Sequence, residues 1–133
     1  MRQLLILITF ISSLIVSSVA HAEWTKVEES DIGDISYVDF ERIKKHNGKI
    51  YYWLLTDYSK SLGYGIFSFK GYAQAECGRL RYRYINQTYY KGPMGSGKIE
   101  VIVNTPEKEW YYPRPNSTGE GELKAVCNHK TMQ

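Results

Sequence analysis

The segment that decides the fold reads Cys77-Gly-Arg-Leu-Arg-Tyr-Arg-Tyr-Ile-Asn-Gln-Thr-Tyr-Tyr90. Its alternation predicts a strand with Leu80, Tyr82 and Tyr84 on one face. The other face then carries Arg79, Arg81 and Arg83. A period of two is typical of a half-buried strand in an antiparallel sheet. The segment also begins with one of only two cysteines, so it predicts one end of a covalent link.

Gly78 predicts an interruption near the start of this strand. In an unbroken strand Cys77 would share its face with the arginines, where a buried disulfide is unfavourable. We therefore expect a tight turn or a bulge at Gly78 that places Cys77 on the side of Leu80 and the tyrosines.

The first 22 residues have the pattern of a cleaved signal peptide. Arg2 provides a positive start, residues 4–16 form an apolar run, and Ala20-His21-Ala22 matches the small-x-small cleavage site. We expect a signal peptide over residues 1–22 and one mature domain over residues 23–133, with no membrane span after cleavage. The alternative is an uncleaved anchor, because residues 4–20 are almost long enough to cross a bilayer.

Charge and composition exclude some partners and favour others. The net charge of +3 falls to +2 once Arg2 is removed, which is too weak to indicate binding of nucleic acid or anionic lipid. Tyrosine is in excess, with all twelve in the mature part. Tyrosine suits half-buried strands as well as binding surfaces, so both interpretations stay open.

Two cysteines behind a signal peptide predict a disulfide, Cys77–Cys127, formed in an oxidising compartment. Such a bond closes a loop of about 50 residues and restricts the unfolded state by roughly 4 kcal/mol. The alternatives are two free thiols or metal ligation. No His or further Cys stands at ligand spacing to complete a zinc site, so we expect no metal.

The remaining pattern predicts an α+β fold, an antiparallel sheet of about six strands with one C-terminal helix packed on it. Besides the opening segment, strands are expected over residues 24–27, 35–39, 50–58, 66–77 and 98–103. Asn47-Gly48 is a strong hairpin signal. Ser117 and Glu120 form a capping box for a helix from Thr118 to about His129, in which the Glu120 carboxylate is expected to accept from the Ser117 amide.

The glycine-rich stretch 92–98 has the spacing of a phosphate-binding loop, G-x-x-x-x-G-K. Ile99 stands where Ser or Thr is needed for magnesium, and a strand follows instead of a helix. We interpret the stretch as a hairpin loop. No G-x-S-x-G motif is present, so we expect no catalytic site, no cofactor and no enzymatic activity.

A basic stripe is the candidate binding surface, made of Arg79, Arg81, Arg83, Lys91 and Lys98, with Tyr89 and Tyr90 at its edge. An acidic or sulfated partner would suit it. The alternative is an ordinary solvated strand face, since arginine is a common outward residue with an apolar stem.

The chain resembles the bacterial surface-adhesin protein E family over essentially the whole mature part. The matching residues are Trp24, Tyr37-Val-Asp39, Trp53, Asp57-Tyr58, Cys77, Arg81-Tyr-Arg83, Tyr90, Pro93-Met-Gly-Ser-Gly97, Trp110, Pro115-Asn-Ser117 and Cys127. The resemblance implies an antiparallel sheet with a C-terminal helix, the Cys77–Cys127 disulfide and no catalytic site. It also implies binding of host extracellular-matrix glycoproteins and dimerisation.

One difference from the family bears on location. The surface lipoprotein form carries a lipidated Cys after its signal peptide, whereas here Ala22 is followed by Glu23 and Trp24. We therefore expect a periplasmic or released protein of a Gram-negative bacterium that binds a host matrix protein or another envelope protein. The alternatives are a periplasmic structural protein without a host ligand and a small-ligand carrier with a tyrosine-lined pocket of about 300 Å³ or more.

Overall fold

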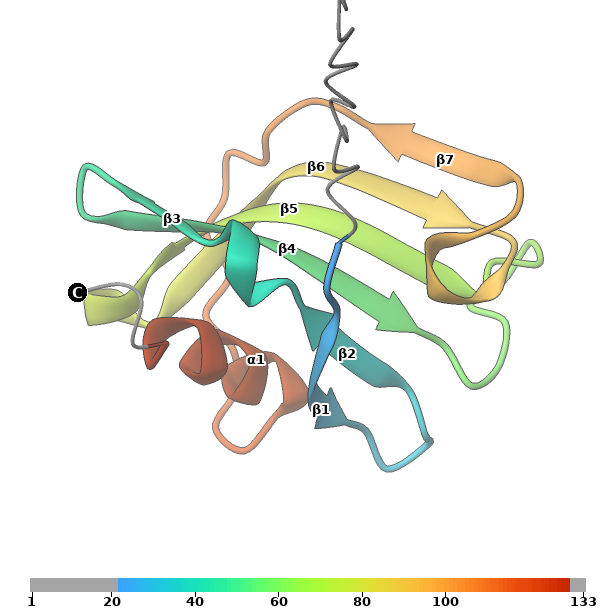
Figure 1. Ribbon diagram of the computed structural model, residues 1–133, viewed down its shortest axis with the longest axis horizontal. Coiled ribbons are helices and arrows are strands. Elements are labelled where there is room, and N and C mark those ends of the chain that lie inside the picture. The colour runs from blue at the N-terminus through green and yellow to red at the C-terminus, as the bar shows by residue number, and fades with distance from the viewer. Residues whose placement is uncertain (1–21, 130–133) are drawn as a thin grey trace, which may run out of the picture.

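The computed structural model describes residues 22–129, so the expected signal peptide, apart from Ala22, lies outside the described residues (Figure 1). The elements are β1 (Thr25–Glu29), β2 (Ile35–Val38), β3 (Lys44–His46), β4 (Lys49–Asp57), β5 (Ser68–Glu76), β6 (Arg81–Tyr90), β7 (Ile99–Val103) and helix α1 (Thr118–Cys127). Three short 3-10 turns join them, η1 (Phe40–Arg42), η2 (Cys77–Arg79) and η3 (Pro93–Gly95). The predicted α+β class is confirmed.

All seven strands form a single antiparallel sheet in the order β1-β2-β4-β5-β6-β7, with β3 paired to β4. The count exceeds the expected six or so, because residues 44–46 pair with β4 across the predicted Asn47-Gly48 turn. Strand β4 is central: its first half contacts β3 and its second half contacts β2, while β5 runs along its other side. Figure 1 shows the twisted sheet with β7 at one edge and β1 at the other.

The core lies between one face of the sheet and α1. Ala73 and Ala75 of β5 are fully buried there, and these small side chains leave room for the helix. Leu123 and Val126, one turn apart on α1, are fully buried against them. Burial of a leucine or valine side chain contributes about 1.5–3 kcal/mol, so this contact anchors the helix.

The interruption expected at Gly78 exists as η2, which separates β5 from β6. The left-handed residue is Leu80 (φ 48°) and not Gly78. After this turn Glu76 pairs with Arg81, and Ala75 with Tyr82. Tyr82 therefore shares the core face with Ala75, and Arg81 points to the opposite face.

The start of α1 is capped by side chains. The Ser117 hydroxyl accepts a hydrogen bond from the Glu120 amide at 3.2 Å. The Glu120 carboxylate accepts from the amide of Asn116 at 3.3 Å, one residue earlier than the capping box predicts. It also contacts Lys124 Nζ at 2.9 Å, one turn along the helix. The helix ends at Cys127, two residues before the predicted end.

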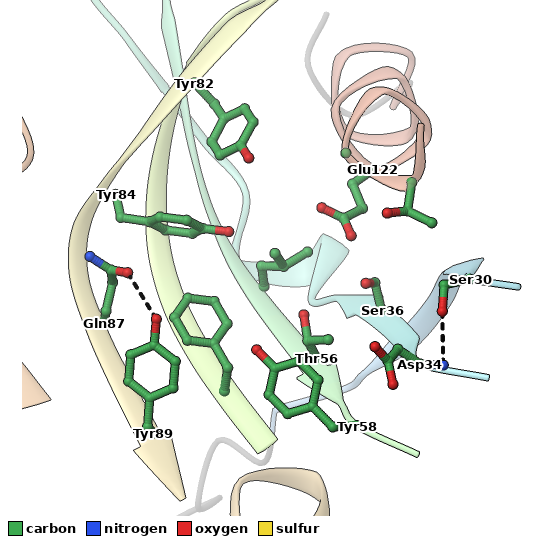
Figure 2. A pocket seen from close by; sticks show the side chains of 14 residues that line it. Ser30, Asp34, Ser36, Thr56, Tyr58, Tyr82, Tyr84, Gln87, Tyr89 and Glu122 are labelled. Atoms are coloured by element: carbon green, nitrogen blue, oxygen red, sulfur yellow. Dashed lines mark hydrogen bonds between the residues drawn. The ribbon is translucent and has the colours of Figure 1, made fainter. Parts of the chain in front are cut away.

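A pocket of about 360 Å³ remains where α1 stands away from the sheet (Figure 2). Tyr82 and Tyr84 of β6 point into it from one side, and Glu122 of α1 points into it from the other. The tyrosines predicted for the core face are thus only partly covered by the helix.

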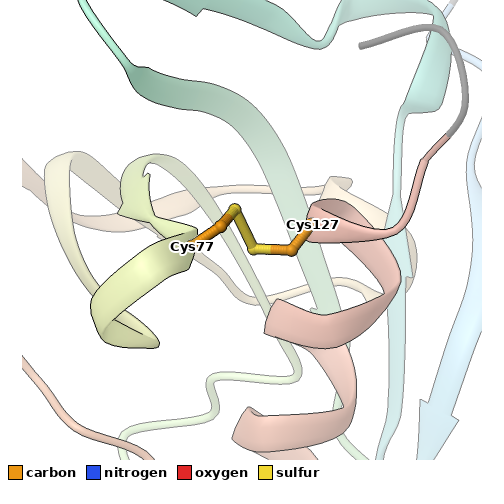
Figure 3. The surroundings of a disulfide bond; sticks show 2 residues. All are labelled: Cys77 and Cys127. Carbon is orange, nitrogen blue, oxygen red and sulfur yellow. A yellow bond between two sulfur atoms is a disulfide. The ribbon is translucent and has the colours of Figure 1, made fainter. Parts of the chain in front are cut away.

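The disulfide joins Cys77 of η2 to Cys127 at the end of α1 (Figure 3). The two Cα atoms lie 5.7 Å apart, and the bond spans 50 residues of sequence. The predicted pairing is confirmed. The bond ties the C-terminal end of the helix to the turn between β5 and β6.

Candidate functional site

The face of the sheet turned away from α1 carries no α-helix within residues 22–129. We call it the open face. Alternation along the central strands places Trp53 of β4 and Tyr72 of β5 on it, directly opposite each other in the ladder. Their rings lie 4.9 Å apart between centroids.

Arg81 and Arg83 of β6 lie on the same open face, and both stack on Trp110. The guanidinium carbons lie 4.3 Å and 4.4 Å from the centre of the indole ring. The segment after β7 brings Trp110 there, because Tyr111 exchanges two backbone hydrogen bonds with Tyr82, at 2.8 and 3.0 Å. Arginine stacked on tryptophan is the favoured form of cation–π contact.

Three cationic side chains surround the Glu76 carboxylate at this end of the open face. Its carboxylate lies 2.9 Å from Arg81 Nη2, 3.9 Å from Arg79 Nε and 4.0 Å from Lys49 Nζ. Arg81 is also held by the Tyr112 hydroxyl, which accepts from Nη1 at 3.0 Å. One carboxylate cannot neutralise three cations, so this end of the face stays positive.

Arg83 is oriented by a chain of polar side chains. Its Nε donates to Gln74 Oε1 at 2.7 Å, and Gln74 Nε2 donates to the Tyr51 hydroxyl at 2.6 Å. Gln74 is only 7% exposed, so these bonds satisfy a polar group that lies beneath the surface. The Arg83 side chain is therefore fixed in place, which lowers the entropy cost of presenting it to a partner.

A second cluster continues the pattern toward β2. The Arg42 guanidinium lies 5.3 Å from the Trp53 ring and 6.0 Å from the Trp24 ring. Asp39, which is 1% exposed, fixes it by accepting from Arg42 Nε at 2.6 Å. Lys70 Nζ lies 5.8 Å from Trp24, and burial together with the neighbouring Arg42 charge lowers the pKa of Lys70.

These contacts form one continuous arrangement, which we call the aromatic–cationic band. Its members are Trp24, Arg42, Trp53, Lys70, Tyr72, Tyr90, Tyr51, Gln74, Arg83, Trp110, Arg81 and Tyr112. It contains all three tryptophans of the chain. Tryptophan, tyrosine and arginine are the residue types that dominate binding energy at protein interfaces.

The structure divides the basic stripe that the sequence predicts. Arg81, Arg83 and Tyr90 belong to the band, and Arg79 lies beside it in η2 with a side chain 69% exposed. Tyr89 points to the opposite face, where its ring packs 5.0 Å from that of Phe69.

The two lysines of the predicted stripe lie at the far end of β6. Lys91 and Lys98 flank the β6–β7 hairpin, and Lys91 Nζ contacts Glu100 at 3.4 Å. At about 3.4 Å per residue, the length of β6 separates them from Arg81 by roughly 30 Å. They are therefore not part of one compact site with the arginines.

The glycine-rich loop folds back over the sheet. Its amides bond to the protein itself: Met94 donates to Asp57 Oδ1 at 2.8 Å, and Gly95 donates to Ser68 Oγ at 2.8 Å. Gly97 has φ +76°, and a Cβ there would lie 2.9 Å from Gly92 N. The loop thus closes one end of the open face, in agreement with its interpretation as a hairpin loop.

Sequence reasoning missed most of the band. Trp53 and Tyr72 could have been placed on the open face by the period of two in their strands. Trp24, Arg42 and Trp110 lie outside the strands, and only the tertiary fold brings them to the sheet.

Among residues 22–129, His, Cys, Asp and Glu side chains form no group of three that could hold a metal ion. No helix within these residues is long and apolar enough to cross a bilayer.

Comparison with known proteins identifies a matching family and solved structures with a similar fold. The family described as Surface-adhesin protein E matches residues 24–128. Comparison with curated protein sequences finds no match. Among solved structures, Haemophilus influenzae protein E has a TM-score of 0.60 at 15% identity, covering 80% of this chain and 85% of that chain. A second crystal form of that protein has a TM-score of 0.59 at 14% identity, covering 80% and 88%.

Proposed function

Because the chain belongs to the surface-adhesin protein E family, we propose that it is an exported binding domain without catalytic activity that recognises a protein through its aromatic–cationic band. Membership of a family of surface adhesins implies an exported or surface protein. The partner class we propose is a host extracellular-matrix glycoprotein.

The aromatic–cationic band carries this proposal. It joins all three tryptophans with fixed guanidinium groups on a sheet face that no described α-helix covers. Trp and Arg are enriched among the residues that contribute most to interfaces. Its positive charge would also attract acidic or sulfated groups, which glycoproteins of the matrix carry.

A solid-phase binding test of the oxidised mature domain against purified matrix glycoproteins examines the proposal. Arg83→Gln and Trp110→Leu should each weaken binding by about 2 kcal/mol, which is roughly thirtyfold in Kd. The contribution of Arg83 should shrink as salt is added, because screening weakens exposed charges. Lys60→Gln, a change of the same charge in an exposed loop, is the control. Binding that is unaffected by both band variants would refute the assignment.

We place the protein in the periplasm or in released form. The disulfide supports an oxidising compartment. Fractionation of the source cells tests this location. Protein confined to the periplasm could not reach host matrix, and the second candidate, an envelope-associated protein that binds another envelope protein, would then be favoured.

Self-association is a further part of the proposal. Strand β7 lies at an edge of the sheet, and Ile99, Val101 and Ile102 on it are 44%, 41% and 54% exposed. Edge strands with exposed apolar side chains readily pair with a second chain. Sedimentation should therefore detect a homodimer that Val101→Lys weakens. A protein that stays monomeric at high concentration would exclude it.

A further inference from the structure

The pocket between α1 and the sheet lies on the opposite side of the sheet from the aromatic–cationic band. Its volume of about 360 Å³ falls in the range of small-molecule sites. Aromatic rings form one wall, among them Tyr82, Tyr84 and Tyr89 (Figure 2). Phe69 also lines the pocket. The volume satisfies the lower limit expected for a carrier, but the lining is rich in hydroxyl groups and is not apolar.

Charge in the lining has a single sign. Asp34 and Glu122 are the acids, and within residues 22–129 no Lys, Arg or His side chain lines the pocket. Asp34 is already occupied at the rim, where Oδ1 accepts from the Ser59 amide at 2.9 Å. Glu122 projects from α1 toward the centre of the pocket (Figure 2). It is therefore the carboxylate available to an occupant.

The hydroxyl groups around Glu122 are neutral at ordinary pH. Burial raises the pKa of Tyr82 to about 12, and burial raises the pKa of Tyr84 as well. These side chains offer oxygen acceptors and ring faces but no counter-charge. Burial raises the pKa of the Glu122 carboxyl; the nearby Ser36 hydroxyl opposes this rise, and Glu28 on β1 adds to it.

We propose that this pocket binds a small organic cation, a molecule with a primary ammonium group on a short hydrocarbon body. The ammonium would pair with Glu122 and donate to the surrounding hydroxyl oxygens. Its hydrocarbon body would pack on the rings of Phe69 and Tyr84, and the ring faces would also attract the ammonium group. A buried carboxylate is costly without a partner, and a cation in the pocket supplies one.

Two matched probes test the charge requirement, n-butylammonium and n-butanol, which share a carbon skeleton and differ in the charged group. Each is titrated into the ¹⁵N-labelled mature domain at about pH 8, well above the ordinary pKa of a carboxyl group. We expect saturable amide shifts around Ser36 and Glu122 with butylammonium, and an affinity at least tenfold lower for butanol. Equal affinity for the two probes, or shifts elsewhere in the domain, would overturn the proposal.

Glu122→Gln should lower the affinity for butylammonium at least tenfold while keeping the shape of the side chain. Glu100→Gln, on the distant strand β7, removes the same charge and should leave the affinity unchanged. Thermal unfolding of both variants shows whether the fold is intact. Retained affinity in folded Glu122→Gln would contradict the role of this carboxylate. Neither result depends on glycoprotein binding, because the probes address the other side of the sheet.

Discussion

Gly71 lies where β5 passes beneath two aromatic rings. A Cβ at this position would lie 2.6 Å from Phe69 Cζ and 2.7 Å from Tyr84 Cε1, so an alanine would displace the rings. We predict that Gly71→Ala lowers the free energy of unfolding by about 1–3 kcal/mol. Urea denaturation with both midpoint and slope recorded measures the change.

Gly78 provides the control for this prediction. A Cβ there would meet nothing within 4 Å, and the residue has no positive φ. Gly78→Ala should therefore change stability by no more than about 0.5 kcal/mol. Equal losses in the two variants would mean that ring packing around Gly71 is not the cause.

Glu122 gives the domain a predictable dependence on pH. Burial raises the pKa of this carboxyl above its ordinary value near 4.5, with Glu28 adding to the rise and Ser36 opposing it. The folded state then holds the proton more tightly than the unfolded state, so stability falls as pH rises from about 4.5 through the raised pKa. Glu122→Gln should remove this decline and stabilise the domain at neutral pH, because the amide does not ionise. Chemical unfolding of both proteins across that pH range measures it, and parallel curves would contradict it.

At the level of secondary-structure elements, the disulfide joins α1 to the sheet. The helix itself contacts the sheet through only a few buried residues. Removing it with Cys77→Ser and Cys127→Ser together should lower the free energy of unfolding by about 4 kcal/mol, the chain-entropy value for a loop of this length. The amides of α1 should then lose protection from hydrogen exchange before those of β4 and β5. Simultaneous loss in all three elements would show that the helix does not separate from the sheet.

The N-terminal cap of the same helix predicts a smaller effect. Ser117→Ala removes the hydroxyl that accepts from the Glu120 amide and should cost about 1 kcal/mol. Ser117→Asp, which preserves an acceptor, should restore most of it. Thermal unfolding of the two variants measures the difference, and equal melting temperatures would show that the cap contributes little.

Elements with strong periodicity were predictable from the sequence, and their connections were not. The apolar pattern of residues 50–58 and the capping signal at Ser117 locate β4 and α1 to within two residues. The turn before β6 was expected from Gly78, yet the left-handed conformation falls on Leu80, since the core contacts of that side chain outweigh its local preference. The bulge between β5 and β6 has no sequence signal of its own.

Across the whole molecule, the sheet separates the two proposed binding surfaces. Arg81 and Arg83 of the band were recognised in the sequence because they alternate within one strand. Their aromatic partner Trp110 could not be, since it follows β7 and reaches β6 only through tertiary pairing. The pocket also depends on how far α1 stands from the tyrosines, which no local pattern encodes.

This arrangement predicts that the two surfaces act independently. Trp110→Leu should weaken glycoprotein binding and leave butylammonium affinity unchanged. Glu122→Gln should weaken butylammonium binding and leave glycoprotein binding unchanged. Changes at distant sites without shared partners are usually additive. The double variant should therefore show both losses at their single-variant sizes. A loss of butylammonium affinity in Trp110→Leu would indicate coupling through the sheet.

The bond between Cys77 and Cys127 also imposes an order on events during export. A chain that emerges from a translocation channel with its N-terminus first presents Cys77 while its partner is still 50 residues behind. Strands β6 and β7 leave the channel within that interval, so both borders of the sheet are available before the thiols can meet. All seven strands are therefore available for pairing before the disulfide can form.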